Sequence, residues 1–394
     1  MRILVVLPRF PYPLEKGDKL RAYHQLRCLS DSHEVYLFCL SHQPVEPQHI
    51  EHLKQFCADV EVVHLRKLSS YYHAFCNLLK VRSLQIGFWT SPEARRRYQS
   101  FERKVDPDVI YSQMVRTMTL VAHSSRPKVM DFQDALSLNM QRRMEHTRKG
   151  LRRAAFHYEF KMLRSAEYDS FSIFDALTII SDPDSMAIPH RMNHEINIVP
   201  NGVDFDYFHP MPEVEKRYDV VFCGNMQYPP NVDTSLFLAT QVMPLVWREI
   251  PNAKLLLAGA TPSATVRKLA NERVIVSGTV DDIRQCYAAG RVFAAPMRIG
   301  SGLQNKLLEA MSMQIPCVSS PLVNKALGAT PDQHLLIADH PQDVANHILD
   351  LLHNPQRGES LAQEAHTFVH QHFSWQSYSK QLEEILMQAS GKKI

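Results

Sequence analysis

Short apolar runs alternate with longer segments of helical periodicity along the first half of the chain, a pattern typical of parallel sheets with helical crossovers. Residues 18–30 have apolar side chains near helical spacing and open on Asp18, which we expect to cap the helix. One long helical stretch, rich in arginine, is predicted between 137 and 170. Buried strands are predicted at 3–8, 34–40, 59–65, 108–113, 127–134, 176–181 and 196–204.

A second series of the same kind follows the proline-rich and charged segment 205–219. Its strands are predicted at 220–224, 253–259, 273–278, 291–296, 315–320 and 334–339. Two alternating series joined by a linker predict an α/β protein of two facing Rossmann-like domains with parallel sheets. We place the domains at 1–205, with the C-terminal helix 376–394 added, and at 206–375.

Composition favours a water-soluble chain that works in a reducing compartment. Hydrophobic residues make up 45% and charged residues 22% of the 394 positions, values of an ordinary globular protein. No apolar run is long enough to predict a membrane-spanning helix. The seven cysteines are scattered and lack C-x-x-C spacing, which favours a cytoplasmic protein without a disulfide framework.

Charge is concentrated in one segment, residues 65–104, which has nine basic and two acidic residues interleaved with aromatic ones. This make-up has two interpretations. The segment could rest on an anionic membrane surface, making the protein peripheral on the inner face of the membrane. Alternatively, it is a solvated helix face whose aromatic side chains pack inward. Nucleic-acid binding is not expected, since the whole chain carries a net charge of only +3 and shows no such motif.

The loop 297–302 is the strongest candidate binding site in the sequence. It follows a predicted strand, carries Gly300 and Gly302, and leads into a helix with Lys306 near its start. Glycines let a ligand approach the backbone, and a helix N-terminus favours an anion. Lys306 would add a full charge against a diphosphate, and Glu309 could accept hydrogen bonds from ribose hydroxyls. A glycine turn followed by a surface Lys–Glu pair is the alternative.

Two further strand ends carry residues suited to a nucleotide. Gly224 and Asn225 follow the strand 220–224, where a glycine admits a ligand and an amide offers neutral hydrogen bonds. Thr279 and Val280 follow the strand 273–278, and their backbone groups could contact a nucleobase edge. In open α/β domains ligands bind beyond the carboxyl ends of the strands, so these ends are expected to form one pocket.

These motifs resemble those of the family 4 glycosyltransferases of the GT-B fold. The resemblance lies in "VPNGVDFDYFHP" at 199–210 and in the P…G-x-G-x-x-x-K-x-x-E-A-M pattern at 296–311, and it extends over essentially the whole chain. The bacterial sugar transferases of exopolysaccharide and exosortase-associated clusters are the most similar subgroup. The resemblance implies a retaining, metal-independent hexosyl transfer from a nucleotide diphosphate sugar, with UDP or GDP as the expected carrier and no cofactor.

The same resemblance assigns a donor site to the domain 206–375 and an acceptor site to the domain 1–205, with the last helix crossing back to the latter. Glu309 matches the glutamate that holds the donor ribose, whereas the family's other glutamate falls at Ser301. The family's diphosphate-binding Arg and Lys fall at Asn225 and Pro230, so we expect Lys306, with Arg298, to replace them catalytically. The expected donor residues are Gly224, Asn225, Thr279, Val280, Arg298, Gly300, Ser301, Gly302, Leu303, Asn305, Lys306 and Glu309.

In the acceptor domain, Gly17 matches the family's glycine loop after the first strand, with Asp18 and Arg21 at its border. Asp131 and Asp134 stand where the family often has a polar catalytic residue, and either could bind an acceptor hydroxyl or receive its proton. Asp134 could equally cap the next helix.

No metal site is predicted. The three D-x-D triplets, at 106–108, 182–184 and 204–206, lie in turn-like or linker contexts, and the histidines show no ligand spacing. The sequence therefore predicts a glycosyltransferase that acts on a polysaccharide, a lipid-linked glycan or another glycan acceptor. Two alternatives remain open: a nucleotide-sugar 2-epimerase-like isomerase, and a non-catalytic relative that binds the donor.

Overall fold

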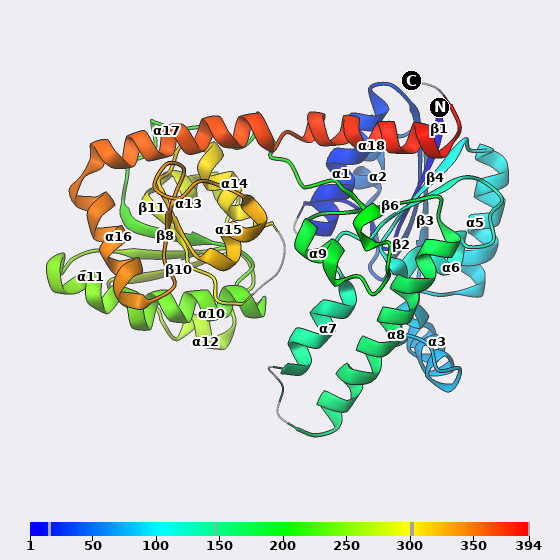
Figure 1. Cartoon of the computed structure of the whole chain (residues 1–394), viewed down its shortest axis with the longest axis horizontal. Helices are drawn as coiled ribbons and strands as arrows, with labels where there is room; N and C mark the ends of the chain where they lie inside the picture. The colour runs from blue at the N-terminus through cyan, green and yellow to red at the C-terminus, as the bar shows by residue number, and fades with distance from the viewer. Residues whose placement is uncertain (15–16, 146, 148, 300–302, 393–394) are drawn as a thin grey trace. The chain divides into compact units, whose positions relative to one another are not determined.

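The computed structural model describes residues 1–14, 17–145, 147, 149–299 and 303–392 (Figure 1). It divides the chain into two compact units, Met1–Pro200 with Trp375–Ile394, and Asn201–Ser374. The boundary predicted after residue 205 lies five positions beyond the observed one. Each unit contains a parallel sheet of its own, as the alternating pattern predicts.

The first unit is built on a seven-stranded parallel sheet of order β3-β2-β1-β4-β5-β6-β7. Successive residues of β1 point to opposite faces, so Leu4 and Val6 join one hydrophobic cluster while Ile3 and Val5 join the other. Both faces are thus buried, which explains the continuous apolar runs. The strands are Arg2–Leu7 (β1), Glu34–Ser41 (β2), Asp59–His64 (β3), Val109–Gln113 (β4), Lys128–Asp131 (β5), Ala176–Ile179 (β6) and Asn197–Ile198 (β7).

Helices cover both faces of this sheet. The C-terminal helix α18, Trp375–Ala389, belongs to the first unit and packs on α1, where the Trp375 and His24 rings stack with centroids 4.9 Å apart. The other helices are Gly17–Ser30 (α1), Pro47–Leu53 (α2), Lys67–Leu79 (α3), Leu84–Phe88 (α4), Pro92–Val105 (α5), Val115–Thr117 (η1), Met118–Val121 (α6), Leu136–Glu145 (α7), Leu151–Ile173 (α8), Asp182–Ala187 (α9) and Asn193–Glu195 (η2).

Two helix predictions in this unit were wrong in detail. The stretch 137–170 is not continuous, because α7 ends at Glu145 and α8 starts after Gly150. Gly150 has φ 141°, a backbone conformation that favours glycine and interrupts a helix. Asp18 does not precede α1 as a cap; it lies inside the first turn, since the helix already begins at Gly17.

The second unit has a six-stranded parallel sheet of order β10-β9-β8-β11-β12-β13. Its strands are Tyr218–Cys223 (β8), Leu255–Ala258 (β9), Val274–Gly278 (β10), Gly290–Ala295 (β11), Cys317–Ser319 (β12) and Leu336–Ile337 (β13). Its helices are Pro229–Phe237 (α10), Leu238–Val242 (η3), Met243–Glu249 (α11), Ala264–Arg267 (α12), Ile283–Ala288 (α13), Asn305–Ser312 (α14), Pro321–Leu327 (α15), Pro341–His353 (α16) and Pro355–His372 (α17).

Both sheets have a point at which the strand order reverses, between β1 and β4 in the first unit and between β8 and β11 in the second. Loops diverge from such a point to opposite faces of the sheet and leave a crevice at the carboxyl ends of the strands. Residues after β1, β4, β8 and β11 are therefore the best placed to contact a ligand.

Candidate active site

Lys306, the second residue of α14, lies at the reversal point of the second unit. Its Nζ donates to the amide oxygens of Asn231, at 2.7 Å, and Gln304, at 3.3 Å. The ammonium also lies 5.4 Å from the centre of the Phe222 ring. The charge thus has neutral hydrogen-bond partners within the described residues, and no carboxylate pairs with it directly.

This environment changes the acidity of Lys306. Burial lowers the pKa of its ammonium to about 8, and the nearby Glu309 opposes that shift. A desolvated ammonium without a paired anion is destabilised, and an arriving anion would relieve that cost. Strongly perturbed groups of this kind gather at functional sites.

Glu309 lies one turn further along α14 and is held by Tyr287 of α13, whose hydroxyl donates to Oε2 at 2.7 Å. Its Oε1 has no partner among the described residues. Burial raises the pKa of Glu309, whereas the Tyr287 hydroxyl and Lys306 act to lower it. One carboxylate oxygen is thus fixed by the protein and the other is left for a ligand.

The loop after β8 shapes the floor of this site. Asn231 donates to the carbonyl oxygen of Asn225 at 2.9 Å while accepting from Lys306. A Cβ on Gly224 would lie 2.6 Å from the Asn231 amide, so only glycine fits there. The Asn225 side chain itself stabilises the loop, because its Oδ1 accepts from Gln227 N and Thr261 Oγ1, both at 3.0 Å.

The remaining predicted donor residues are less uniformly placed. Arg298 forms a bidentate ion pair with Asp233, with N···O distances of 2.8 and 3.1 Å, so its charge is already paired with a carboxylate. Thr279 and Val280 follow β10, which β9 separates from β8 in the same parallel sheet, and their place in one pocket with the ends of β8 and β11 stays a prediction. Asn305 accepts from Asn201 at 3.2 Å, and Leu303 is buried. Gly300, Ser301 and Gly302 lie outside the described residues.

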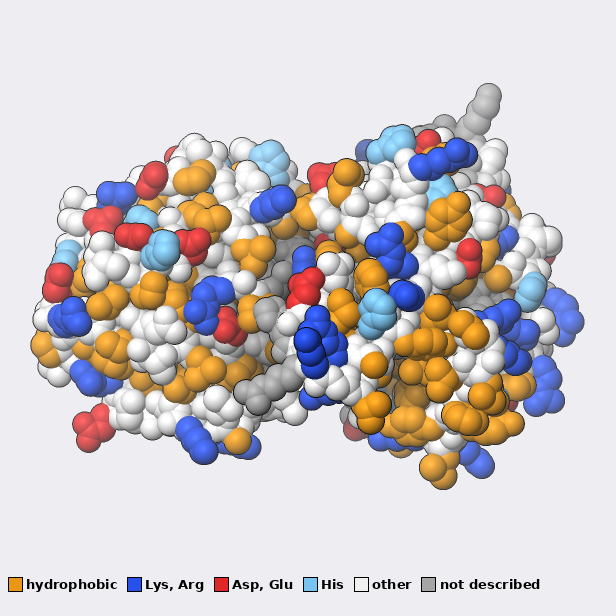
Figure 2. All heavy atoms as spheres, turned by 60° about the horizontal axis from the view of Figure 1, so that its bottom comes forward, with side chains coloured by type: hydrophobic (Ala, Val, Ile, Leu, Met, Phe, Trp, Pro, Cys, Tyr) orange, Lys and Arg blue, Asp and Glu red, His pale blue; other side chains and the backbone are white. Residues whose placement is uncertain are grey.

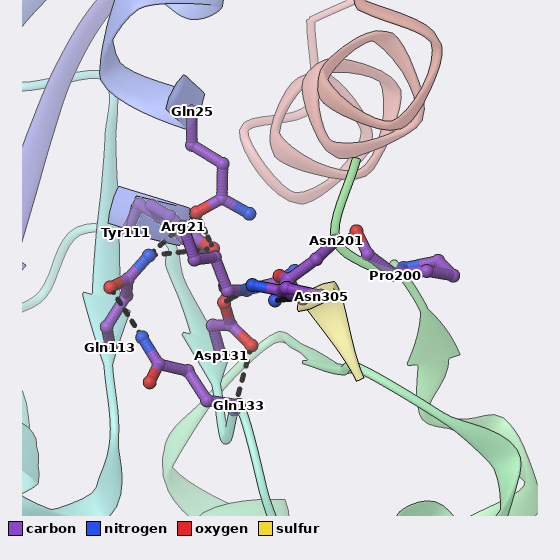
Figure 3. Close-up of polar contacts among 9 residues, drawn as sticks. All are labelled: Arg21, Gln25, Tyr111, Gln113, Asp131, Gln133, Pro200, Asn201 and Asn305. Atoms are coloured by element: carbon purple, nitrogen blue, oxygen red, sulfur yellow. Dashed lines mark hydrogen bonds and ion pairs between the residues drawn. The ribbon is translucent and has the colours of Figure 1, made fainter. Parts of the chain in front are cut away.

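Arg21 and Asp131 form a buried ion pair in the first unit (Figure 3). Arg21 Nε donates to Asp131 Oδ2 at 2.6 Å, and both side chains are at most 1% exposed. The same oxygen accepts from the Tyr111 hydroxyl at 2.8 Å, and Oδ1 accepts from the backbone of Gln133 at 2.9 Å. Both oxygens of Asp131 are therefore engaged, which suits a positioning residue better than a proton acceptor.

Three glutamines extend this network across the ends of β4 and β5 (Figure 3). Gln25 Oε1 accepts from Gln113 at 2.7 Å and lies 3.0 Å from the Tyr111 hydroxyl oxygen, and Gln113 in turn accepts from Gln133 at 2.9 Å. A connected network of this kind fixes side chains in a core. The network therefore holds polar side chains in fixed positions beneath the point at which the strand order of the first unit reverses.

Asp134 differs from Asp131 in having no hydrogen-bond partner for its side chain among the described residues. Burial, followed by the charge of Asp184, raises its pKa to about 7, and Arg21 only partly offsets this. Asp134 does not itself cap α7, because Asp184 receives the backbone N–H of Ala135 at the start of that helix. Asp134 is thus a partly buried carboxyl that titrates near neutrality.

The other predicted acceptor residues lie along the start of α1. Arg9 donates to Asp18 at 2.5 Å, so Asp18 orients a cation from the loop after β1. Gly17 is helical, and a Cβ there would meet nothing within 4 Å, so the position does not depend on glycine. Arg21, as described above, is buried in the ion pair with Asp131.

Sequence reasoning missed several residues of these sites. Tyr287 and Tyr111 each hold a carboxylate but read as ordinary apolar positions of a helix and a strand. Arg116, just after β4, has an Nε without a hydrogen-bond partner in the described part of the chain. Burial, with Arg9 nearby, lowers the pKa of Arg116 to about 10. Polar residues at the end of an apolar strand are the signal that would have pointed to Gln113 and Arg116.

Over the described residues, no group of three or more His, Cys, Asp or Glu side chains is arranged to hold an ion.

Comparison with known proteins gives this geometry a context. Residues 217–354 match the family described as "Glycosyl transferases group 1". A Klebsiella pneumoniae protein, "Uncharacterized 44.6 kDa protein in cps region", is 23% identical over 94% of this chain and 96% of its own length.

Solved structures show the same fold over almost the whole chain. HepE of Anabaena, solved with UDP-glucose, has a TM-score of 0.71 at 16% identity, covering 98% of this chain and 99% of its own. Sucrose-phosphate synthase of Thermosynechococcus elongatus has 0.70 at 15% identity, with 98% and 99% covered. TarM of S. aureus has 0.69 at 11% identity, with 98% and 100% covered. The chain thus has the GT-B fold, and its residues 217–354 match the group 1 glycosyltransferases. The exosortase-associated subgroup remains a prediction.

Proposed function

We propose that this GT-B glycosyltransferase moves a hexose from a nucleotide diphosphate sugar, carried by UDP or GDP, to a glycan or lipid-linked glycan. Transfer retains the anomeric configuration and needs no metal ion. The donor binds to the second unit and the acceptor to the first. Support comes from HepE, solved with UDP-glucose, from TarM, solved with UDP and glycan ligands, and from the Klebsiella protein of a cps region, which suggests exopolysaccharide synthesis.

The observation that carries this proposal is the state of Lys306. Its buried ammonium has amide partners and a lowered pKa, and it sits at the N-terminal turn of α14, where free backbone N–H groups favour an anion. A diphosphate bound there would complete the ion pair that the protein leaves open. Because charge grows on the diphosphate as the glycosidic bond breaks, Lys306 stabilises the leaving group more than the substrate.

Glu309 fixes the nucleoside end of the donor. Its oxygen Oε1, without a partner among the described residues, accepts a hydrogen bond from a ribose hydroxyl, while Tyr287 holds Oε2 in place. Such a bond orients the donor but does not change during the reaction. Glu309 therefore contributes to donor affinity, and Lys306 contributes to the rate.

Asp134 binds the acceptor hydroxyl in this proposal. A carboxyl that titrates near pH 7 is suited to take up the proton that the hydroxyl loses as it attacks the sugar. The positive charges of Arg9 and Arg143 act on Arg116 and help to lower its pKa, and such a group of cations would suit an acceptor that carries a phosphate. A lipid-linked glycan has such a phosphate group, and an acceptor of this kind would favour a location on the inner face of the cell membrane.

The test is release of nucleoside diphosphate from a panel of UDP- and GDP-sugars, with and without glycan acceptors. Lys306→Ala is expected to lower turnover about a hundredfold or more, the usual loss for one charge-stabilising donor. Lys325→Ala, an exposed lysine of α15, is the matched control and should have no effect. Equal turnover by both variants would overturn the site assignment. Sugar conversion that needs no acceptor would instead favour an epimerase.

A further inference from the structure

Helix α3 presents its large apolar side chains to solvent. Leu68 is 86% exposed, Tyr72 64% and Leu79 69%, and the apolar positions recur at helical spacing along one face. Figure 2 shows the corresponding broad hydrophobic area low on the first unit, with Lys and Arg around its edge. The apolar face consists of Leu68, Tyr71, Tyr72, Phe75, Leu78 and Leu79, with Val81 just beyond the helix.

The opposite face of α3 is small and polar, and it is the one that packs on the protein. Ser70 is 2% exposed and its hydroxyl lies 2.9 Å from His42 Nε2. Asn77 donates to the carbonyl of Ser83 at 3.1 Å, and Gly87 of α4 lies against Ala74 and Asn77, too close for any Cβ. A globular helix normally buries its apolar face. In α3 the polar face packs on the protein and the apolar face points to solvent, so the apolar face is available to a partner outside the chain.

Positive charge borders both ends of this apolar face. Arg66 and Lys67 precede it and Lys80 and Arg82 follow it, and all four side chains are exposed. Within the described residues none of the four forms an ion pair, and no acidic residue occurs between 62 and 92. By contrast, Arg97 and Lys104 of α5 are paired with Glu61 and Asp59. Arg96 and Arg103 of α5 are exposed and, within the described residues, form no ion pair either, but α5 buries its apolar side chains. Within the segment 65–104, cations without an ion pair therefore border an exposed apolar face at α3 alone among the described helices.

The rest of the segment 65–104 behaves as an ordinary part of the fold. Trp89 is buried, and Phe88 is partly buried against it and His42. The predicted inward packing is therefore right for Phe88 and Trp89 and wrong for Tyr72 and Phe75. Tyr71 is largely exposed, although its ring packs edge-on against Phe88 with centroids 5.2 Å apart. Any surface for a partner is α3 and its flanking residues, and α5 is not part of it.

We propose that α3 lies along the surface of an anionic lipid bilayer. Its apolar face inserts at the boundary between headgroups and acyl chains, and its four flanking cations contact the lipid headgroups. A single weak anchor gives only marginal binding, whereas apolar insertion combined with a basic patch holds a protein on a membrane. α3 supplies both signals. This proposal identifies the surface through which the protein would contact the membrane. The reason for that contact, access to a lipid-linked acceptor, rests on the proposed function. Lipid binding itself can be measured without sugar transfer.

Flotation with vesicles of phosphatidylcholine and phosphatidylglycerol, compared with phosphatidylcholine alone, tests this surface. The full chain is expected to float with the anionic vesicles and to be released by salt. Phe75→Ser/Leu79→Ser and Lys67→Glu/Lys80→Glu should each lower binding at least about tenfold. Arg96→Glu/Arg103→Glu on α5 makes the same charge change within the same segment and should bind about as well as the parent chain.

Equal losses in the α3 and α5 charge variants would overturn the proposal, because net charge rather than α3 would then set binding. Failure of the parent chain to float would also overturn it, as would an apolar face that turns out to join two copies in light-scattering measurements. Unchanged thermal unfolding of the variants excludes misfolding. Unchanged transfer to a water-soluble acceptor separates loss of membrane binding from failure of the proposed reaction.

Discussion

The two reversal points of this protein handle buried charge in opposite ways. In the first unit Arg21 has a carboxylate partner at 2.6 Å, and a tyrosine and three glutamines complete the network around it. In the second unit Lys306 has amide partners, and Glu309 has a tyrosine. The first arrangement pairs its cation directly with a carboxylate, although Gln25 Nε2 in the same network is buried without a hydrogen-bond partner in the described part of the chain. The second leaves a cation without a directly paired anion in the described residues.

This difference distinguishes charged groups that stabilise the fold from charged groups that are available to bind a ligand. A completed buried pair is costly to break but offers little to a substrate. A buried charge without a paired counter-charge destabilises the fold, and a protein retains such a charge where it contributes to ligand binding. Substitutions at the two points should therefore affect different properties: stability in the first unit and turnover in the second.

The largest expected effect is on stability, from Asp131→Ala. Removing this carboxylate leaves Arg21 buried and uncompensated, which costs about 3–5 kcal/mol. Thermal unfolding should show the loss. The double variant Arg21→Met/Asp131→Leu removes both charges and should recover much of it, whereas Asp339→Ala, at an exposed site, should change nothing. If the single and double variants are equally unstable, the ion pair is not the cause.

Lys306→Met should produce the opposite result. Turnover is expected to fall by about 10²–10³, because the leaving diphosphate loses its cation. The melting temperature should stay the same or rise, since the variant no longer buries a charge whose pKa is lowered to about 8. Lys306→Arg, which keeps the charge, should retain part of the activity. A marked loss of stability in Lys306→Met would make this lysine a structural residue like Arg21.

Asp134→Asn should reduce turnover by about a hundredfold, toward the lower end of what proton transfer contributes. Its stability effect depends on pH. The folded pKa is raised from 3.8 to about 7, so the ionised carboxyl destabilises the fold above pH 7 and not below pH 3.8. The asparagine variant should therefore melt higher than the parent in alkaline buffer and equally in acid. Equal melting across the whole range would show that Asp134 is not held in a costly state.

The smallest effect is expected at Gly17, which the family resemblance marks as a glycine of the acceptor loop. The helical backbone and the open space around its Cα leave room for a methyl group. Gly17→Ala should change stability by no more than about 1 kcal/mol, in the stabilising direction. Acceptor KM is the sensitive readout, because a methyl group would obstruct a sugar that approaches this backbone. An unchanged KM would remove Gly17 from the acceptor site.

The sheets were predictable because burial on both faces produces long apolar runs, and each predicted strand overlaps an observed one. The helix break at Gly150 was not predictable, since a single glycine inside a helical pattern usually destabilises a helix only slightly. The direction of the α3 aromatics was left open between two interpretations, because the same periodicity predicts an apolar face without saying which side of the helix meets the protein.

Sequence also predicted that Lys306 and Glu309 lie on one helix directly after a strand, since that spacing is local information, and their donor-binding roles stay a prediction. The pairing of Arg21 with Asp131 could not be read in this way, because the two residues are 110 positions apart. Tyr111 and Gln25, which complete that network, look like ordinary members of an apolar strand and a helix. Long-range polar networks depend on strand order, and strand order does not follow from periodicity.

The central claim is that Lys306 is a buried cation whose missing anion is the donor diphosphate. Calorimetry of UDP or GDP binding in buffers of different ionisation enthalpy tests it most directly. Near pH 8, where free Lys306 is partly deprotonated, binding should take up protons, and affinity should fall as pH rises further. Lys306→Met should bind more weakly and without this uptake. Proton uptake that is absent in the parent chain, or unchanged in Lys306→Met, would contradict the claim.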